Sequence, residues 1–320
     1  MEKILLGTYT KNTSEGIYSI DLVDGHLVNL SLVAKAQNPT YLDYDATTRR
    51  LYSIAQKDAL GGIAVWDYNG KTATLVEEYM QEGVQPCYVR YDKDEDVIYD
   101  ANYHRGTFTT YGDGEVQKVF EYQKGAHAHF ADIDPKTKDV FVCDLGNDAI
   151  HKYRLLNEIA TYKTTEGMGP RHLVFHPTAP YIYILGELNN TVEVVKDLEF
   201  EFELVQAIST LPEEGIQSGG GAIRISDDGK FVYATNRGHD SITSYKIEED
   251  YTLTVVSNDS VHGGHPRDFA LSLDQNYLVV ANRDANNLVL FKRDVENGTL
   301  TYIEEVDAPE VVATLFIEVA

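Results

Sequence analysis

The chain has 320 residues, a formal net charge of −24 and 43% hydrophobic residues. This apolar content is enough for a large buried core, and no run of about 18 apolar residues offers a membrane span. The negative charge is spread along the whole chain, which disfavours binding to nucleic acid or to anionic membranes, because both need a basic surface. An anionic ligand would therefore need a locally positive cavity.

The two cysteines and the N-terminus indicate a reducing compartment. Cys87 and Cys143 lie far apart, without further Cys or His at metal-finger spacing, so we expect reduced structural thiols. The N-terminal apolar run of MEKILLGTYT is too short for a signal peptide. A cytoplasmic protein is expected, as a monomer or weak homo-oligomer.

Three short apolar segments open the chain, and many more follow. The composition includes 22 Tyr and 11 Phe but only three Met, and clusters of turn residues recur throughout, which is typical of many short strands. The first three predicted strands are KILLGTYT from Lys3, GIYSIDL from Gly16 and LVNLSLV from Leu27.

A unit of two apolar strands joined by a polar turn then repeats six times. The copies are Asn38–Ala55, Gln85–Asn102, Ala126–Asp144, Gly169–Glu187, Gly219–Asn236 and His265–Asn282. A third strand follows most of them, such as Gly62–Tyr68, Ala149–Leu155, Thr191–Val195, Ser241–Ile247 and Asn287–Arg293, and a weaker polar strand comes next. A four-stranded antiparallel unit with a period of about 40 to 50 residues is typical of a propeller blade.

The two ends of the chain complete a seventh unit. The C-terminal segment from Ala308, APEVVATLFIEV, resembles a first strand without successors, and the N-terminal segments resemble second, third and fourth strands without a first. Joining them closes the ring without a free sheet edge. We therefore predict an all-β, seven-bladed β-propeller as a single domain over residues 1–320.

In such a ring, the starts of the first strands and the ends of the second strands meet at one mouth of the central channel. The first-strand starts supply His127, His129, Arg171, His172 and Arg267. The second-strand ends supply Tyr9, Asn102, Asp144, Glu187, Asn236, Arg237, Asn282 and Arg283. The opposite mouth, formed by turns such as Asp227–Gly229, is expected to hold ordinary solvated turn residues. Function is predicted at the first mouth.

The segment Gly167–Thr191 is the most informative part of this mouth. It contains a strand, a turn around Pro177 and Pro180, and a second strand. Because the start of one strand and the end of its antiparallel partner lie at the same edge, Arg171, His172 and Glu187 should be neighbours.

The motifs of this mouth resemble those of the seven-bladed propeller lactonase family, which includes 6-phosphogluconolactonases of the bacterial propeller type and fungal carboxymuconate-lactonizing enzymes. The resemblance covers essentially the whole chain and rests on GPRHLVFHP with GELNNTV, AHAHFADIDP with DLGNDAI, NRGHDSI and HPRDFAL. It implies a site of His129, Arg171, Glu187 and Arg237. The chain departs from the family at Cys143 and at Leu185-Gly186, and the family name covers several lactones.

Lactone hydrolysis by these residues needs a base, an oxyanion site and an anion clamp. His129 or Glu187 would be the general base, and we favour His129. Arg171 and Arg237 would bind the oxyanion or an anionic group, with Arg267 or Arg283 as a further clamp. The expected partner is a small anionic lactone, with 6-phosphogluconolactone as the preferred substrate, and no cofactor is implied.

Other interpretations remain open. An Arg–Glu pair at a channel mouth is often structural, and Arg267 and Arg283 could pair with Asp268 and Asp284. The spacing of His127 and His129 allows a metal, but the arginines opposite are unsuitable ligands, so no metal is predicted. A non-catalytic propeller that binds a partner or small ligand and a muconate-type lactonizing enzyme are the alternatives in function.

Overall fold

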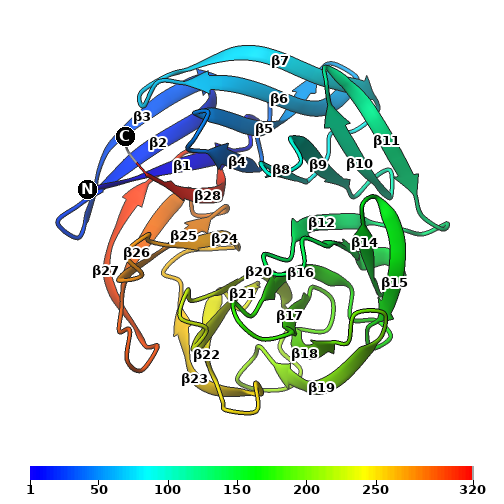
Figure 1. Cartoon of the computed structure of the whole chain (residues 1–320). Helices are drawn as coiled ribbons and strands as arrows, with labels where there is room; N and C mark the ends of the chain where they lie inside the picture. Colours follow the sequence, from blue (N-terminus) through cyan, green and yellow to red (C-terminus); the bar gives the residue numbers. More distant parts are fainter. Residues whose placement is uncertain (319–320) are drawn as a thin grey trace.

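The computed structural model describes residues 1–318, which form seven sheets of four antiparallel strands in a ring (Figure 1). The only helical element among these residues is one short 3-10 turn. These residues therefore contain no helix that is long and apolar enough to cross a membrane. The predicted all-β, seven-bladed propeller is confirmed. The first strand of each repeat is innermost, and the polar fourth strand is outermost.

The first three complete blades follow one another along the chain. Their strands are β4 (Leu42–Asp45), β5 (Arg50–Lys57), β6 (Leu60–Tyr68) and β7 (Ala73–Glu82), then β8 (Tyr88–Asp92), β9 (Val97–Asn102), β10 (Thr107–Gly112) and β11 (Glu115–Glu121), then β12 (Ala128–Ile133), β13 (Val140–Asp144), β14 (Ala149–Arg154) and β15 (Asn157–Lys163). The 3-10 turn η1 (Leu145–Asn147) joins β13 to β14.

Three further blades have the same order. Their strands are β16 (Pro170–Phe175), β17 (Tyr181–Gly186), β18 (Thr191–Asp197) and β19 (Phe202–Ser209), then β20 (Gly219–Ile225), β21 (Phe231–Arg237), β22 (Ser241–Ile247) and β23 (Leu253–Ser260), then β24 (Pro266–Leu271), β25 (Tyr277–Asn282), β26 (Asn287–Arg293) and β27 (Leu300–Asp307).

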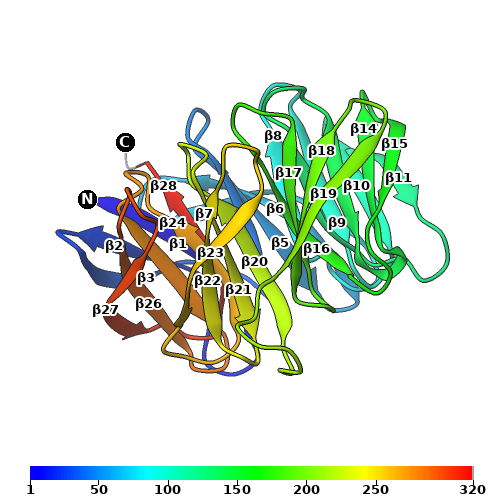
Figure 2. The same cartoon turned by 90° about the horizontal axis from the view of Figure 1, so that it is seen from below.

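The seventh blade is shared by the two termini, as the sequence predicts. Its order is β28 (Val311–Ile317), β1 (Glu2–Thr8), β2 (Gly16–Val23) and β3 (His26–Lys35), and β28 pairs antiparallel with β1. The strands β28 and β1 lie side by side in both views (Figure 1 and Figure 2). Glu310 strengthens the closure, because its carboxylate accepts hydrogen bonds from the backbone N–H groups of residues 11–14 at 2.9–3.1 Å.

The core lies between neighbouring blades. For example, Ile4 and Leu6 of β1 share a buried cluster with Leu288 and Leu290 of β26 in the next blade. The flat faces of adjacent sheets are therefore apolar, whereas most residues of the outermost strands, such as β11, are exposed. The innermost strands pack around the channel and fix the positions of residues at its mouths.

A β-bulge at the start of several innermost strands displaces one residue from the ladder. Between β16 and β17 the pairing jumps from Pro170 to His172, which leaves Arg171 without a paired residue. The same jump leaves out His129 in β12 and Arg267 in β24. Bulges commonly re-aim a side chain next to a site. Three predicted site residues thus occupy the extra position of a bulge.

Candidate functional site at the channel mouth

A cavity of about 240 Å³ lies at the predicted mouth of the channel, and we call it the cup. Its lining comes from residues at or just before the starts of the innermost strands and at or just after the ends of the second strands. These residues are Tyr9, Thr40, Val84, Gln85, Pro86, Cys87, Tyr103, His104, His129, Glu187, Arg237 and Arg267. Arg171 contacts the cup indirectly, because it forms an ion pair with Glu187 of the lining. The cup therefore joins residues from all seven blades.

One carboxylate oxygen links two arginines of the cup. Oε2 of Glu187 lies 3.0 Å from Nε of Arg171 and 2.8 Å from Nη2 of Arg237. His172 is adjacent, because its Nε2 accepts a hydrogen bond from Nη1 of Arg171 at 3.2 Å. The prediction that Arg171, His172 and Glu187 are neighbours is confirmed.

Backbone carbonyl groups of the Gly219–Gly221 run anchor both guanidinium groups. Nη1 of Arg171 donates to the carbonyl of Gly221, and Nε of Arg237 donates to that of Gly220 at 2.9 Å. A Cβ on Gly221 would lie 2.4 Å from Oγ1 of Thr235, so only glycine fits there. The glycine run thus lets β20 approach its neighbours closely enough to hold the arginines.

Burial and the interactions between the charged side chains shift the pKa values of residues at the cup. Burial, together with neighbouring guanidinium groups, lowers the pKa of Arg171 to about 9 and also lowers that of Arg237. Burial alone would raise the pKa of Glu187, but Arg171 and Arg237 outweigh it and hold this pKa below the ordinary value. At neutral pH the bridge therefore consists of two cations and one anion.

Arg267 adds a cation whose charge has no partner among residues 1–318. It lines the cup and makes none of the hydrogen bonds or ion pairs found there, although its guanidinium carbon lies 5.9 Å from the ring centre of Tyr9. The alternative pairing with Asp268 is wrong, because Asp268 binds Arg224 at 2.6 Å. Arg283, by contrast, does pair with Asp284 at 2.7 Å and does not line the cup.

His129 is a neutral imidazole in this setting. It is 5% exposed, and burial with the nearby charges of Arg171 and Arg267 holds its pKa well below 6.5. Its Nδ1 has no hydrogen-bond partner within residues 1–318. An unprotonated imidazole next to cations can accept a proton from water. Cys87 is no rival nucleophile, because burial raises its pKa to about 12.

Several predicted ligand-binding residues lie beside the cup but outside its lining. Nδ2 of Asn102 donates to the carbonyl of Val84 at 2.9 Å, and that of Asn236 donates to the carbonyl of Thr210 at 2.8 Å. The carboxylate of Asp144 accepts from the backbone N–H of His127 at 2.8 Å. These side chains hold the loops around the mouth, and the structure gives them no free group toward a ligand.

Tyr103 connects His127 with His129. The ring of His127 stacks on Tyr103 with centroids 4.3 Å apart, and its Nδ1 lies 2.8 Å from the carbonyl oxygen of Tyr103. The ring of His129 meets Tyr103 edge-on at 6.1 Å. His127 thus supports a wall of the cup. No cluster of three or more metal-binding side chains occurs within residues 1–318.

Some lining residues were missed by the sequence analysis, although a signal was present. Thr40 and Cys87 follow a proline at the start of their repeats, as Arg171 and Arg267 do in Gly-Pro-Arg and His-Pro-Arg. The residue after this proline is therefore the one that the repeat places at the mouth of the channel. Tyr103 and His104 come from the loop after β9, for which the repeat contains no comparable pattern.

An aromatic layer closes the bottom of the cup. Tyr41, Tyr88, Phe130 and His172 contact one another, with centroids 4.2 Å apart for Tyr41 and Tyr88, 4.4 Å for Tyr88 and Phe130, and 4.9 Å for Phe130 and His172. His129 contacts this layer through His172 at 5.3 Å. The channel is therefore divided into two compartments.

The closed seven-bladed ring and its arginine-rich cup, which contains a histidine and a glutamate, are the features expected of a propeller lactonase. Comparison with known proteins supports this class. The family model described as "Lactonase, 7-bladed beta-propeller" matches residues 3–316. The chain belongs to this lactonase family.

Individual relatives cover the full length. The 6-phosphogluconolactonase of Bacillus subtilis (strain 168) is 36% identical over 98% of this chain and 97% of its own. A crystal structure of a protein from Lactobacillus plantarum is similar at TM-score 0.95 and 35% identity, covering 99% of this chain and 100% of its own. The structure of the periplasmic gluconolactonase PpgL of Pseudomonas aeruginosa is similar at TM-score 0.90 and 26% identity, covering 100% of this chain and 99% of its own.

Proposed function

We propose that this lactonase hydrolyses 6-phosphogluconolactone to 6-phosphogluconate in the cup. The observation that carries the proposal is the excess of positive charge. Within residues 1–318, Arg171, Arg237 and Arg267 face a single carboxylate, that of Glu187, although the chain has a net charge of −24. Such a cavity attracts an anionic substrate against the field of the whole protein. The named Bacillus subtilis relative supports the choice of lactone.

In this proposal His129 is the general base. It removes a proton from the attacking water as the water adds to the lactone carbonyl, and it returns the proton to the ring oxygen when the C–O bond breaks. Glu187 is a weaker candidate, because its ionised form is stabilised by two arginines. Its role is to orient them.

The arginines divide the remaining tasks. None of the hydrogen bonds found within residues 1–318 uses Nη2 of Arg171 or Nη1 of Arg237, so each guanidinium keeps one terminal nitrogen for the substrate. These donors would stabilise the oxyanion that forms at the carbonyl. Arg267, whose guanidinium makes no hydrogen bond or ion pair within the described residues, would hold the phosphate.

The test compares lactone hydrolysis with and without the purified protein, across 6-phosphogluconolactone, unphosphorylated gluconolactone and a dicarboxylate lactone. We expect acceleration above the spontaneous rate, greatest for the phosphorylated substrate. Acceleration of the dicarboxylate lactone alone would contradict this substrate, and no acceleration of any would contradict the enzyme. The expected cytoplasmic location and monomeric or weakly associated state belong to the same proposal and can be measured by fractionation and sedimentation.

A further inference from the structure

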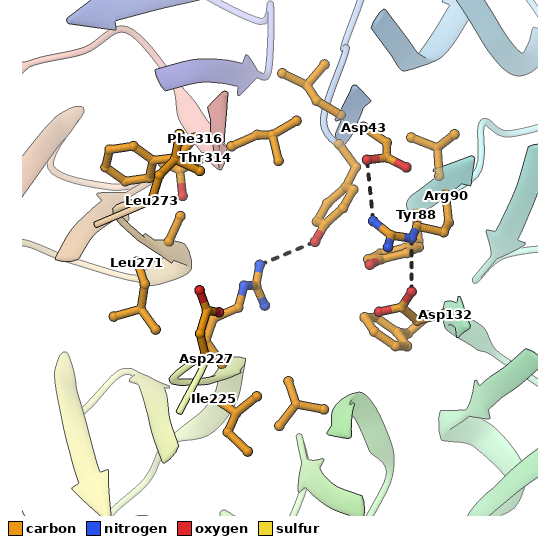
Figure 3. A pocket seen from close by; sticks show the side chains of 18 of the residues that line it. Asp43, Tyr88, Arg90, Asp132, Ile225, Asp227, Leu271, Leu273, Thr314 and Phe316 are labelled. Carbon is orange, nitrogen blue, oxygen red and sulfur yellow. Dashed lines mark hydrogen bonds and ion pairs between the residues drawn. The ribbon is translucent and has the colours of Figure 1, made fainter. Parts of the chain in front are cut away.

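The opposite mouth of the channel contains a second cavity, of about 350 Å³, which we call the distal cavity (Figure 3). It is lined by later residues of the innermost strands and by the turns that follow them, and the aromatic layer separates it from the cup. The expectation that this mouth holds only ordinary solvated turn residues is wrong. Turn residues form part of the rim, but the strands beneath them leave a partly open cavity.

One side of the distal cavity is charged (Figure 3). Arg90 lies between Asp43 and Asp132, with its Nη1 3.5 Å from Oδ1 of Asp43 and its Nε 3.0 Å from Oδ1 of Asp132. The other arginine in the lining, Arg224, is bound to Asp268 at 2.6 Å and to the hydroxyl of Tyr41 at 3.3 Å. Both guanidinium groups therefore already have partners.

The acidic groups are less completely paired. Oδ2 of Asp132 accepts none of the hydrogen bonds found within residues 1–318, and neither carboxylate oxygen of Asp227 does. The lining contains three aspartates, including Asp43, and two arginines. The distal cavity thus has an excess of negative charge, whereas the cup has an excess of positive charge.

The other side of the cavity is apolar. Figure 3 shows Leu271, Leu273 and Phe316 opposite the Arg90 cluster, and Leu273 is 45% exposed. The aromatic residues Tyr88 and Phe130 of the dividing layer line its inner end. A concave site with an apolar wall and few oriented polar groups is typical of small-molecule binding. The single lining threonine, Thr314, adds a buried hydroxyl that has no partner within residues 1–318.

We infer that the distal cavity binds a small organic cation, an ammonium group that carries an apolar substituent. The ammonium would lie at the free oxygen of Asp132 near the aromatic rings, which favour cations, and the substituent would lie on Leu271, Leu273 and Phe316. Asp227 adds attraction from the rim. Anions are disfavoured because Arg90 and Arg224 are occupied by carboxylates.

The experiment uses three probes of similar shape and different charge: benzylammonium, benzyl alcohol and benzoate. Each is titrated into the full-length protein at low salt, and binding is followed by calorimetry. Only benzylammonium should bind at millimolar or lower concentration. Asp132→Asn keeps an oxygen for Arg90 and should weaken binding about tenfold, and Asp227→Asn about threefold.

Asp228→Asn is the matched control, because Asp228 neighbours Asp227 but does not line the cavity and already binds the hydroxyl of Ser226. It should leave the affinity unchanged. Equal binding of all three probes, preference for benzoate, no binding of benzylammonium, or insensitivity to both aspartate variants would each overturn the inference. Lactone hydrolysis does not enter the measurement, so an inactive protein tests it equally well.

Discussion

Arg267 differs from the other arginines of the cup because no carboxylate among residues 1–318 forms an ion pair with it. Arg171 and Arg237 share Glu187, whereas the neighbour of Arg267 in sequence, Asp268, is bound to Arg224. A guanidinium without a protein partner keeps its full charge-assisted bonding capacity for a ligand. The contribution of Arg267 to substrate binding should therefore depend on the charge of the substrate.

Arg267→Gln tests this role. The variant should raise KM for 6-phosphogluconolactone about 10- to 100-fold, since a charge-assisted hydrogen bond is worth about 1.5–3 kcal/mol. Unphosphorylated gluconolactone should be affected much less, and steady-state kinetics on both substrates measure the difference. Arg50→Gln, which breaks only a surface pair with Asp67, is the control. Equal losses on both lactones would show that Arg267 does not bind the phosphate.

His129 provides a prediction about pH. Its pKa lies well below 6.5 because of burial and the nearby arginines, so the neutral form persists as the pH falls. A general base acts only when unprotonated, and the acid limb of kcat/KM should therefore lie well below pH 6.5. His129→Asn should lower kcat about 10²- to 10⁴-fold and abolish that limb. A half-maximal rate near the ordinary histidine pKa, or an unchanged rate in the variant, would assign the base elsewhere.

At the scale of the element, the bulge and the glycine strand act together. The bulge in β16 turns Arg171 out of the ladder, and β20 supplies the carbonyl that receives it. A regular strand would pair Arg171 with the neighbouring strand and change the face on which the following residues lie. The geometry of the cup is therefore a property of paired elements rather than of single residues.

Gly221→Ala should disturb this arrangement. The added Cβ would lie 2.4 Å from Oγ1 of Thr235 and 2.5 Å from the carbonyl oxygen of Pro266, so β20 must shift. We expect a loss of about 1–3 kcal/mol in unfolding free energy, measured in urea, with lower kcat because Arg171 loses its anchor. Gly264→Ala is the control, because its Cβ would meet nothing closer than 3.4 Å. Equal stability of the two variants would contradict the close approach.

At the scale of the whole molecule, stability depends on closing the ring. β28 and β1 come from opposite ends of the chain, and their pairing and the Glu310 contacts complete the seventh blade. Closure also covers the inner edge of β1, because β28 pairs with it. Interactions at this junction should thus affect global unfolding more than similar surface interactions do.

Glu310→Ala should lower the unfolding free energy by about 2–4 kcal/mol, because several backbone N–H groups lose their acceptor. Burial would raise the pKa of Glu310, but these N–H groups outweigh it and lower the pKa. The carboxylate therefore stabilises the folded state above its unfolded pKa, near 4.5, and this contribution is lost as the pH falls through the folded value. Urea titrations at neutral and acidic pH should show the difference shrinking. Glu249→Ala, an exposed site, is the control, and a pH-independent difference would contradict the mechanism.

The sequence by itself determined the ring and the neighbourhood of its polar residues. Turn chemistry and apolar periodicity are local signals, and their repetition predicted the blades, the closure by the termini, and the contact of Arg171 with Glu187 across one antiparallel pair. Each of these follows from the chain order of strands within one blade.

The tertiary structure decided which of these residues remain available to bind a ligand. Asn102 and Asn236 are occupied by backbone carbonyls, Asp268 binds Arg224 rather than Arg267, and an aromatic layer from several blades divides the channel into a cationic cup and an anionic distal cavity. These outcomes depend on bulges and on contacts between blades. No local pattern contains them, because the partner atoms come from segments far apart in the chain that meet only when the ring has closed.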